Sequence, residues 1–262
     1  MDLGLRDKVV IVAGGASNIG RAVSIGFARE GAKVVIADID EVQAKKVAAV
    51  VRDLSGECTV IRTDTTDWES VRRMVEMTLS TYHQIDVLAN CVGWTFDRLF
   101  IEKPREEWEK EIAINYWSVI NCIRAVIDHM IQRKSGSIVS IASDAGRIGE
   151  YREAVYAGCK GAVIALSKSV AREVGRHGIR LNVVCPGLTP PNADEIGEHS
   201  LWKTQAVYMS QDTLEAAKKA YPLRKLGKPE DTANAVLFLS SDACAGHITG
   251  QTLSVSGGYS MV

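Results

Sequence analysis

The chain has 262 residues, of which 46% are hydrophobic and 24% charged, a composition typical of one or two globular domains and unlike that of a disordered or fibrous protein. Its 31 basic and 32 acidic side chains give a net charge of −1, which argues against nucleic-acid and membrane partners. No apolar run approaches the roughly 20 residues of a membrane span. The charged N-terminus lacks the apolar core of a secretory signal.

Short β-rich runs alternate with segments of helical periodicity along the chain. In chain order, the predicted strands are Val9–Ala13, Lys33–Ala37, Cys58–Arg62, Ile85–Ala89, Ser137–Ala142, Ile179–Val184 and Thr252–Val255. The predicted helices between them are Ile19–Arg29, Val42–Leu54, Trp68–Tyr82, Glu106–Arg133, Glu153–Gly175 and Asp231–Ser240. This alternation predicts repeated βαβ units, and hence an α/β fold with a doubly wound parallel sheet and helices on both faces.

No linker or change of composition divides the sequence, so we predict a single domain over residues 1–262. One segment, 188–221, departs from the alternation of strands and helices. It begins near two prolines, is mostly polar and carries Trp202 and Tyr208. A long insertion after a strand in this architecture is typical of a lid over a binding site, and we expect that role here.

Cysteine and histidine lack the spacing of a disulfide frame or a metal site. None of the six cysteines forms a C-x-x-C pair, and the five histidines show no H-E-x-x-H pattern. We therefore predict a reduced, cytoplasmic protein with no bound metal.

The first predicted strand runs into a glycine-rich turn that opens the first predicted helix. Glycines let a backbone approach a pyrophosphate, and the free N–H groups at a helix N-terminus attract that anion. The arrangement predicts a Rossmann-type dinucleotide site, with a plain tight turn as the alternative. The turn residues expected to bind the cofactor are Gly14, Ser17, Asn18, Ile19 and Gly20.

Polar residues end the following strands at the same edge of the sheet. Asp38 lies where an acid accepts hydrogen bonds from the adenosine ribose and repels a 2′-phosphate, so we predict NAD rather than NADP. A capping role for Asp38 is compatible with this function. Asp64 is expected either at the adenine edge or as a helix cap or turn residue. Asn90 and Gly93 follow the fourth strand, on the far side of the nucleotide crevice, where the strand order should reverse.

The strongest candidates for chemistry are Tyr156 and Lys160. Their spacing of four residues places both on one face of a helix, and Ser143 ends the fifth predicted strand. A neighbouring ammonium favours a phenolate, so Lys160 is expected to lower the pKa of Tyr156 into a catalytic range. Such a pair alone is usually a surface pair, and the serine and the nucleotide turn favour the catalytic interpretation.

Together these motifs resemble those of the short-chain dehydrogenase/reductase family over nearly the whole chain. The resemblance implies a catalytic tetrad of Asn115, Ser143, Tyr156 and Lys160. It implies cofactor contacts from Tyr156 and Lys160 and from Pro186, Gly187 and Thr189. Ala13, Asn18 and Cys91 depart from the family's pattern of Thr, Gly and Asn.

The same resemblance implies reversible hydride transfer between a secondary alcohol and NAD. It also implies a homotetramer, and apolar positions such as Trp117 and Val163 on the two long helices are expected at the subunit contacts.

Segments 141–147, 153–156, 182–187 and 253–258 look like those of family members that oxidise an alicyclic β-hydroxyacyl-CoA. We therefore expect a small-molecule substrate with an alicyclic or aromatic hydroxyacyl group, for which a CoA thioester is one candidate. Aromatic side chains expected at the substrate are Trp94, Phe96, Tyr151, Trp202 and Tyr208. The alternatives are a reductase of 3-oxoacyl thioesters, a general dehydrogenase of cyclic secondary alcohols, and a non-catalytic subunit that keeps the dehydrogenase fold.

Overall fold

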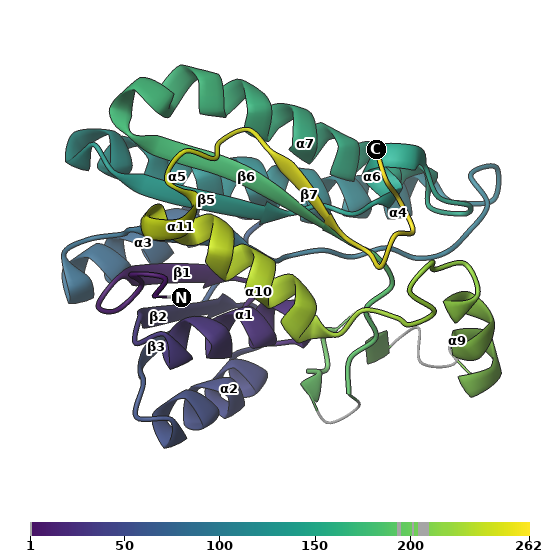
Figure 1. Cartoon of the computed structure of the whole chain (residues 1–262), viewed down its shortest axis with the longest axis horizontal. Helices are drawn as coiled ribbons and strands as arrows, with labels where there is room; N and C mark the ends of the chain where they lie inside the picture. The colour runs from purple at the N-terminus through teal and green to yellow at the C-terminus, as the bar shows by residue number, and fades with distance from the viewer. Residues whose placement is uncertain (1, 193–194, 201, 204–209) are drawn as a thin grey trace.

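Seven parallel strands form one sheet in the order β3-β2-β1-β4-β5-β6-β7 (Figure 1). The computed structural model describes residues 2–192, 195–200, 202–203 and 210–262. The strands are β1 Val9–Ala13, β2 Lys33–Asp38, β3 Glu57–Arg62, β4 Val87–Asn90, β5 Gly136–Ile141, β6 Ile179–Pro186 and β7 Thr252–Val255. The order reverses between β1 and β4, which confirms the predicted doubly wound sheet.

Helices pack on both faces of this sheet (Figure 1). The α-helices of the described residues are α1 Asn18–Arg29, α2 Glu41–Asp53, α3 Trp68–Tyr82, α4 Arg105–Ile112, α5 Ser118–Arg133, α6 Ala145–Ile148, α7 Ala154–Val174, α9 Gln211–Lys218, α10 Pro229–Ser240 and α11 Asp242–Ala245. Helices α1, α2 and α10 cover one face, and α3, α5 and α7 cover the other.

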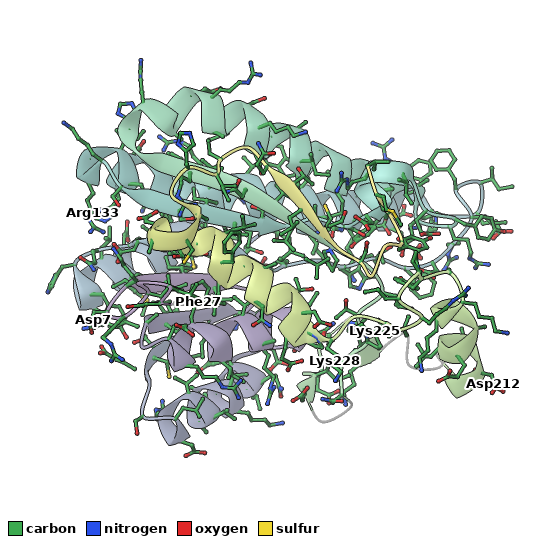
Figure 2. The ribbon with its side chains drawn as sticks, viewed as in Figure 1. Asp7, Phe27, Arg133, Asp212, Lys225 and Lys228 are labelled. Carbon is green, nitrogen blue, oxygen red and sulfur yellow. The ribbon has the colours of Figure 1, made fainter. Side chains whose placement is uncertain are left out.

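Alternate residues of the central strands point to opposite faces, so each face has its own apolar layer. On one face Val12 of β1 packs in the layer that contains Phe27 of α1, which is fully buried and is labelled in Figure 2. On the other face Ile11 packs in the layer of Met74 and Val163. The expectation that Val163 remains available for a subunit contact is therefore wrong, because the monomer core already covers it.

The predicted helix 106–133 is one helical stretch, but a π-helical segment, Ala113–Trp117, joins α4 to α5. Asn115 lies in this segment, and its side-chain amide donates to the Glu111 carbonyl one turn earlier at 2.9 Å. Hydrophobic periodicity did not reveal this change of helix type, which commonly marks functional positions.

The insertion 188–221 contains α9, which the sequence pattern did not predict. Ser210 caps this helix, since its hydroxyl accepts a hydrogen bond from the Thr213 N–H at 3.2 Å. In Figure 1, α9 stands away from the sheet, beyond the carboxyl ends of its strands. Within the described residues, no helix has the length and apolar character needed to span a bilayer.

Candidate active site

A cavity of about 700 Å³ lies at the carboxyl ends of the parallel strands. Its wall includes residues that follow β1, β2, β3, β4, β5 and β6, together with His199, Trp202 and Ala217 of the insertion. This volume suits a small-molecule site, and the position is the switch point at which open α/β sheets bind ligands.

The glycine turn forms a close-fitting cradle at one end of this cavity. Gly14 has a φ of +75°, and a Cβ on it would lie 2.8 Å from a methyl carbon of Val92. A Cβ on Gly20 would lie 1.8 Å from the Gly14 carbonyl oxygen. Ser17 precedes α1 without capping it through its side chain, and the first turn of α1 carries no acid. The cradle therefore fits a dinucleotide pyrophosphate at a positive helix end.

Ala13 stands where the family's pattern has Thr, so the glycine turn has no threonine hydroxyl to hold it, and two other hydrogen bonds do so. The Ser24 hydroxyl donates to the Gly15 carbonyl oxygen at 3.0 Å, and the Ala16 N–H donates to Asp38 Oδ2 at 2.9 Å. These two hydrogen bonds brace the turn from α1 and from the end of β2.

Asn18 adopts the left-handed conformation expected of a glycine, with a φ of +45°. Its amide Nδ2 donates to the Thr189 carbonyl at 3.1 Å, so the side chain connects the glycine turn to the insertion. Ser17 makes a second connection, since its Oγ accepts from the Gly197 N–H at 3.0 Å.

Two acids at strand ends lie along the same side of the cavity. Asp38 Oδ1 accepts from the Asp40 N–H at 3.0 Å, and burial raises the pKa of Asp38. The cap of α2 is Asp40 itself, whose carboxylate accepts from the Gln43 N–H. Asp64 Oδ1 accepts from the N–H and hydroxyl of Thr66, which makes it a turn residue that also lines the cavity.

Tyr156, Lys160 and Ser143 meet at one wall of the cavity. Tyr156 and Lys160 come from one face of α7, and Ser143 follows β5. Lys160 is only 1% exposed, and its ammonium donates to the carbonyl oxygens of Ile141 at 3.0 Å and Val92 at 3.5 Å. Its Nζ lies 5.6 Å from the centre of the Tyr156 ring.

Burial controls the proton equilibria of these groups. Burial raises the pKa of Tyr156 above its usual value, the charge of Glu153 raises it further, and a hydrogen bond from Ser143 lowers it. Burial lowers the pKa of Lys160 to about 8. The expectation that Lys160 brings the pKa of Tyr156 down is therefore wrong for the chain alone, because loss of water dominates around both groups.

Asn115 is fully buried beside this wall, and its side chain hydrogen-bonds backbone groups. Its Oδ1 accepts from the Trp94 N–H at 3.1 Å, while Nδ2 donates to the carbonyls of Trp94 at 2.6 Å and Glu111 at 2.9 Å. A Cβ on Gly93 would lie 3.3 Å from the Lys160 ammonium and 3.5 Å from Asn115 Oδ1. Asn115 thus fixes the segment after β4 against the catalytic wall.

A family model described as enoyl-(acyl carrier protein) reductase matches residues 14–260. The chain belongs to the short-chain dehydrogenase/reductase family. It is 33% identical to a 3-oxoacyl-[acyl-carrier-protein] reductase of Thermotoga maritima, over 97% of this chain and 98% of the relative. It is 35% identical to a 2,5-dichloro-2,5-cyclohexadiene-1,4-diol dehydrogenase of Sphingobium indicum, over 98% of both chains. It is 32% identical to a (3R)-3-hydroxyacyl-CoA dehydrogenase of Canis lupus familiaris, over 99% of this chain and 98% of the relative.

Most residues that the sequence assigned to the cofactor and substrate of this short-chain dehydrogenase/reductase line the cavity. They are Gly14, Ser17, Asn18, Ile19, Gly20, Asp38, Asp64, Gly93, Trp94, Tyr151, Tyr156, Lys160, Pro186, Gly187, Thr189 and Trp202. Asn90 is instead buried between strands, where its amide donates to Ser140 Oγ at 3.0 Å. Phe96 does not line the cavity, and the Arg98 guanidinium lies over its ring at 5.2 Å. Tyr208 lies outside the described residues.

Several polar residues that line the cavity were not assigned from the sequence, and they include Asp97, Glu150, Glu153, Tyr221 and Tyr259. Glu153 had a usable signal, since it lies three residues before Tyr156 and such residues share a helix face. Tyr259 had none, because it reaches the cavity from the C-terminal end and stacks on Tyr221 with ring centres 5.0 Å apart. The described residues contain no group of three His, Cys, Asp or Glu side chains able to hold a metal.

We predict that Gly20→Ala weakens NADH binding by about tenfold or more, which corresponds to at least ~1.4 kcal/mol. The added methyl group would meet the Gly14 carbonyl and force the cradle to open. Fluorescence titration with NADH measures the effect. Gly175→Ala is the matched control, because a Cβ there has no neighbour within 4 Å and should leave the affinity unchanged.

Proposed function

We propose that this protein is an NAD-dependent oxidoreductase that interconverts a secondary alcohol and a ketone. The observation that carries the proposal is the meeting of Tyr156, Ser143 and Lys160 at one wall of the cavity whose other end is the glycine cradle. A proton-transfer group, a hydroxyl donor and a buried ammonium beside a dinucleotide site are what this reaction requires.

The bound dinucleotide supplies the hydride acceptor, and its oxidised ring adds positive charge to the site. During oxidation the Tyr156 hydroxyl oxygen, as phenolate, takes the proton from the alcohol. The Ser143 hydroxyl donates a hydrogen bond to the reacting oxygen and stabilises the charge that develops there. The Lys160 ammonium stabilises the phenolate, and Asn115 acts through the backbone by holding Trp94 and Gly93 in place. Reduction of the ketone reverses these proton movements.

We predict NAD over NADP, measured as the ratio of kcat/KM for the two cofactors. Asp38 lines the cavity and keeps its carboxylate at the end of β2, where it would face a 2′-phosphate. Asp38→Ala should reduce the preference for NAD over NADP, because it removes the carboxylate that repels a 2′-phosphate. It also removes the hydrogen bond from the Ala16 N–H to Asp38. An equal or higher kcat/KM of the wild-type enzyme with NADP than with NAD would contradict the assignment.

For the substrate we propose an alicyclic or aromatic hydroxyacyl group, carried as a CoA thioester. The segments around Ser143, Tyr156 and Pro186 resemble those of 2-hydroxycyclohexanecarboxyl-CoA dehydrogenase. Relatives named for 3-oxoacyl and 3-hydroxyacyl-CoA substrates also support a thioester. The second candidate is a cyclic secondary alcohol without an acyl group, which the relative named for a cyclohexadiene diol favours.

A substrate panel followed at 340 nm with NAD tests the activity and separates these candidates. The panel contains alicyclic β-hydroxyacyl-CoAs, the corresponding free hydroxy acids and simple cyclic alcohols. A non-catalytic subunit with the same fold is the alternative from another class, favoured by the departures at Ala13, Asn18 and Cys91. NADH titration distinguishes it, since a scaffold should not bind the cofactor.

We also propose a homotetramer. Trp117 and Ile112, on the helix that runs from α4 to α5, are 54% and 39% exposed, which leaves apolar surface for a partner subunit. Light scattering at micromolar concentration tests this, and a monomer would refute it.

A further inference from the structure

Glu153 lines the active-site cavity but has no part in the proposed reaction. It immediately precedes α7 and lies close enough to Tyr156 for its charge to raise the pKa of the Tyr156 hydroxyl. Although it occupies the capping position of α7, its carboxylate makes no capping hydrogen bond. The Glu153 carboxylate is therefore not used to cap the helix.

The Glu153 carboxyl hydrogen-bonds the carboxyl of Asp97, which lines the same cavity. Two carboxyls can do this only when they share a proton, and burial together with the charges of Asp97 and Glu150 raises the pKa of Glu153 to about 8. The Asp97 segment is fixed in place: the Arg98 N–H donates to the Arg152 carbonyl at 3.1 Å, and the Arg152 guanidinium donates to the Asp97 carbonyl at 3.2 Å.

Acidic side chains outnumber basic ones along the wall of the cavity. Among the described residues that line the cavity, the basic side chains are Lys160 and His199. The ammonium of Lys160 is directed to backbone carbonyls. Glu150 is already occupied, because it accepts from the Tyr259 hydroxyl and from the Tyr151 N–H. The pair therefore offers hydrogen-bond acceptors and one negative charge to whatever binds beside Tyr156.

We propose that Glu153, paired with Asp97, determines specificity by accepting a hydrogen bond from a second hydroxyl of an uncharged substrate. The proton of the pair lies between the two carboxyls, so the remaining carboxyl oxygens act as hydrogen-bond acceptors. A hydroxyl is an uncharged group that can donate a hydrogen bond to them. The favoured class is a cyclic diol or polyol, a free hydroxy acid is repelled, and an uncharged ester or thioester is tolerated. The inference rests on the proposed function, since it concerns the alcohol that Tyr156 and Ser143 bind, and it favours the second of the two substrate candidates.

The test compares kcat/KM for four compounds, cyclohexanol, cis-cyclohexane-1,2-diol, 2-hydroxycyclohexanecarboxylate and its methyl ester. In wild type the kcat/KM for the diol should exceed that for cyclohexanol by about tenfold or more, because the second hydroxyl of the diol donates to buried acceptors. The methyl ester should exceed the carboxylate by a similar factor, since like charges repel. Glu153→Leu should abolish the preference for the diol. The double variant Glu153→Gln/Asp97→Asn removes the charge of the pair while keeping an acceptor, so it should abolish the discrimination against the carboxylate.

The single variants Glu153→Gln and Asp97→Asn each leave one carboxylate in the pair, so each should keep the discrimination against the carboxylate. Glu102→Gln is the matched control, an exposed acid outside the cavity that should leave every ratio at its wild-type value. NADH affinity should stay constant in all variants. Wild type that oxidises diol and cyclohexanol equally would overturn this inference and leave the proposed function standing. A Glu153→Leu variant that keeps the preference for the diol, or a double variant that keeps the discrimination against the carboxylate, would do the same. If the enzyme oxidised neither the four compounds nor any thioester of the panel, both the proposed function and this inference would be overturned.

Discussion

Tyr156→Phe should lower kcat by about 10²–10⁴-fold, the usual contribution of a positioned proton-transfer group. The substitution removes only the hydroxyl that lines the cavity and leaves the ring packed on α7. NADH affinity and melting temperature should change little, because the cradle and the core are untouched. Steady-state kinetics on a turned-over substrate, with NADH titration and thermal unfolding alongside, measure the three quantities.

Tyr82→Phe is the matched control, since this tyrosine bonds Thr59 at the far side of α3 and should keep wild-type kcat. The oxidation rate should rise with pH and the reduction rate should fall, because oxidation uses the deprotonated and reduction the protonated form of the Tyr156–Lys160 pair. If Tyr156→Phe kept more than about a tenth of wild-type kcat, the assignment of Tyr156 as acid and base would be wrong.

Lys103→Met should lower the free energy of unfolding by about 3–5 kcal/mol. Lys103 and Glu111 form an ion pair whose side chains are 2% and 0% exposed, so the substitution leaves a carboxylate buried without its counter-charge. Glu111 also accepts from the Thr95 hydroxyl at 3.0 Å and from the Phe96 N–H at 3.3 Å. Urea titration measures the loss, and kcat should fall as well because the same carboxylate holds the segment that carries Trp94 and Asp97.

Arg105→Met is the control for this substitution. Arg105 pairs with Glu109 on the same helix, but the two side chains are 80% and 63% exposed, so removing the pair should leave the free energy of unfolding almost unchanged. The double variant Lys103→Met/Glu111→Gln should recover much of the loss, since it no longer buries an uncompensated charge. Equal effects from Lys103→Met and Arg105→Met would show that burial of the pair is unimportant.

The fold and the candidate reactive residues could be predicted from the sequence because both depend on local spacing. Buried parallel strands read as continuous apolar runs, as in Val9–Ala13, and a spacing of four residues places Tyr156 and Lys160 together on any α-helix. Asn18 stands where the family's pattern has Gly, and its left-handed φ of +45° is a conformation that Asn adopts more readily than most residues.

The substrate side of the cavity and the proton equilibria were decided by tertiary structure alone. Asp97, Glu153 and Tyr259 meet there although they are far apart in the sequence, and no periodic pattern links them. Burial raises the pKa of Tyr156 and lowers that of Lys160, and burial depends on neighbours from several strands and helices. The sequence by itself thus determined which groups could react, because spacing along one helix or at one strand end is a local property. Tertiary structure decided what surrounds those groups, because desolvation and charge are set by the packing of distant segments.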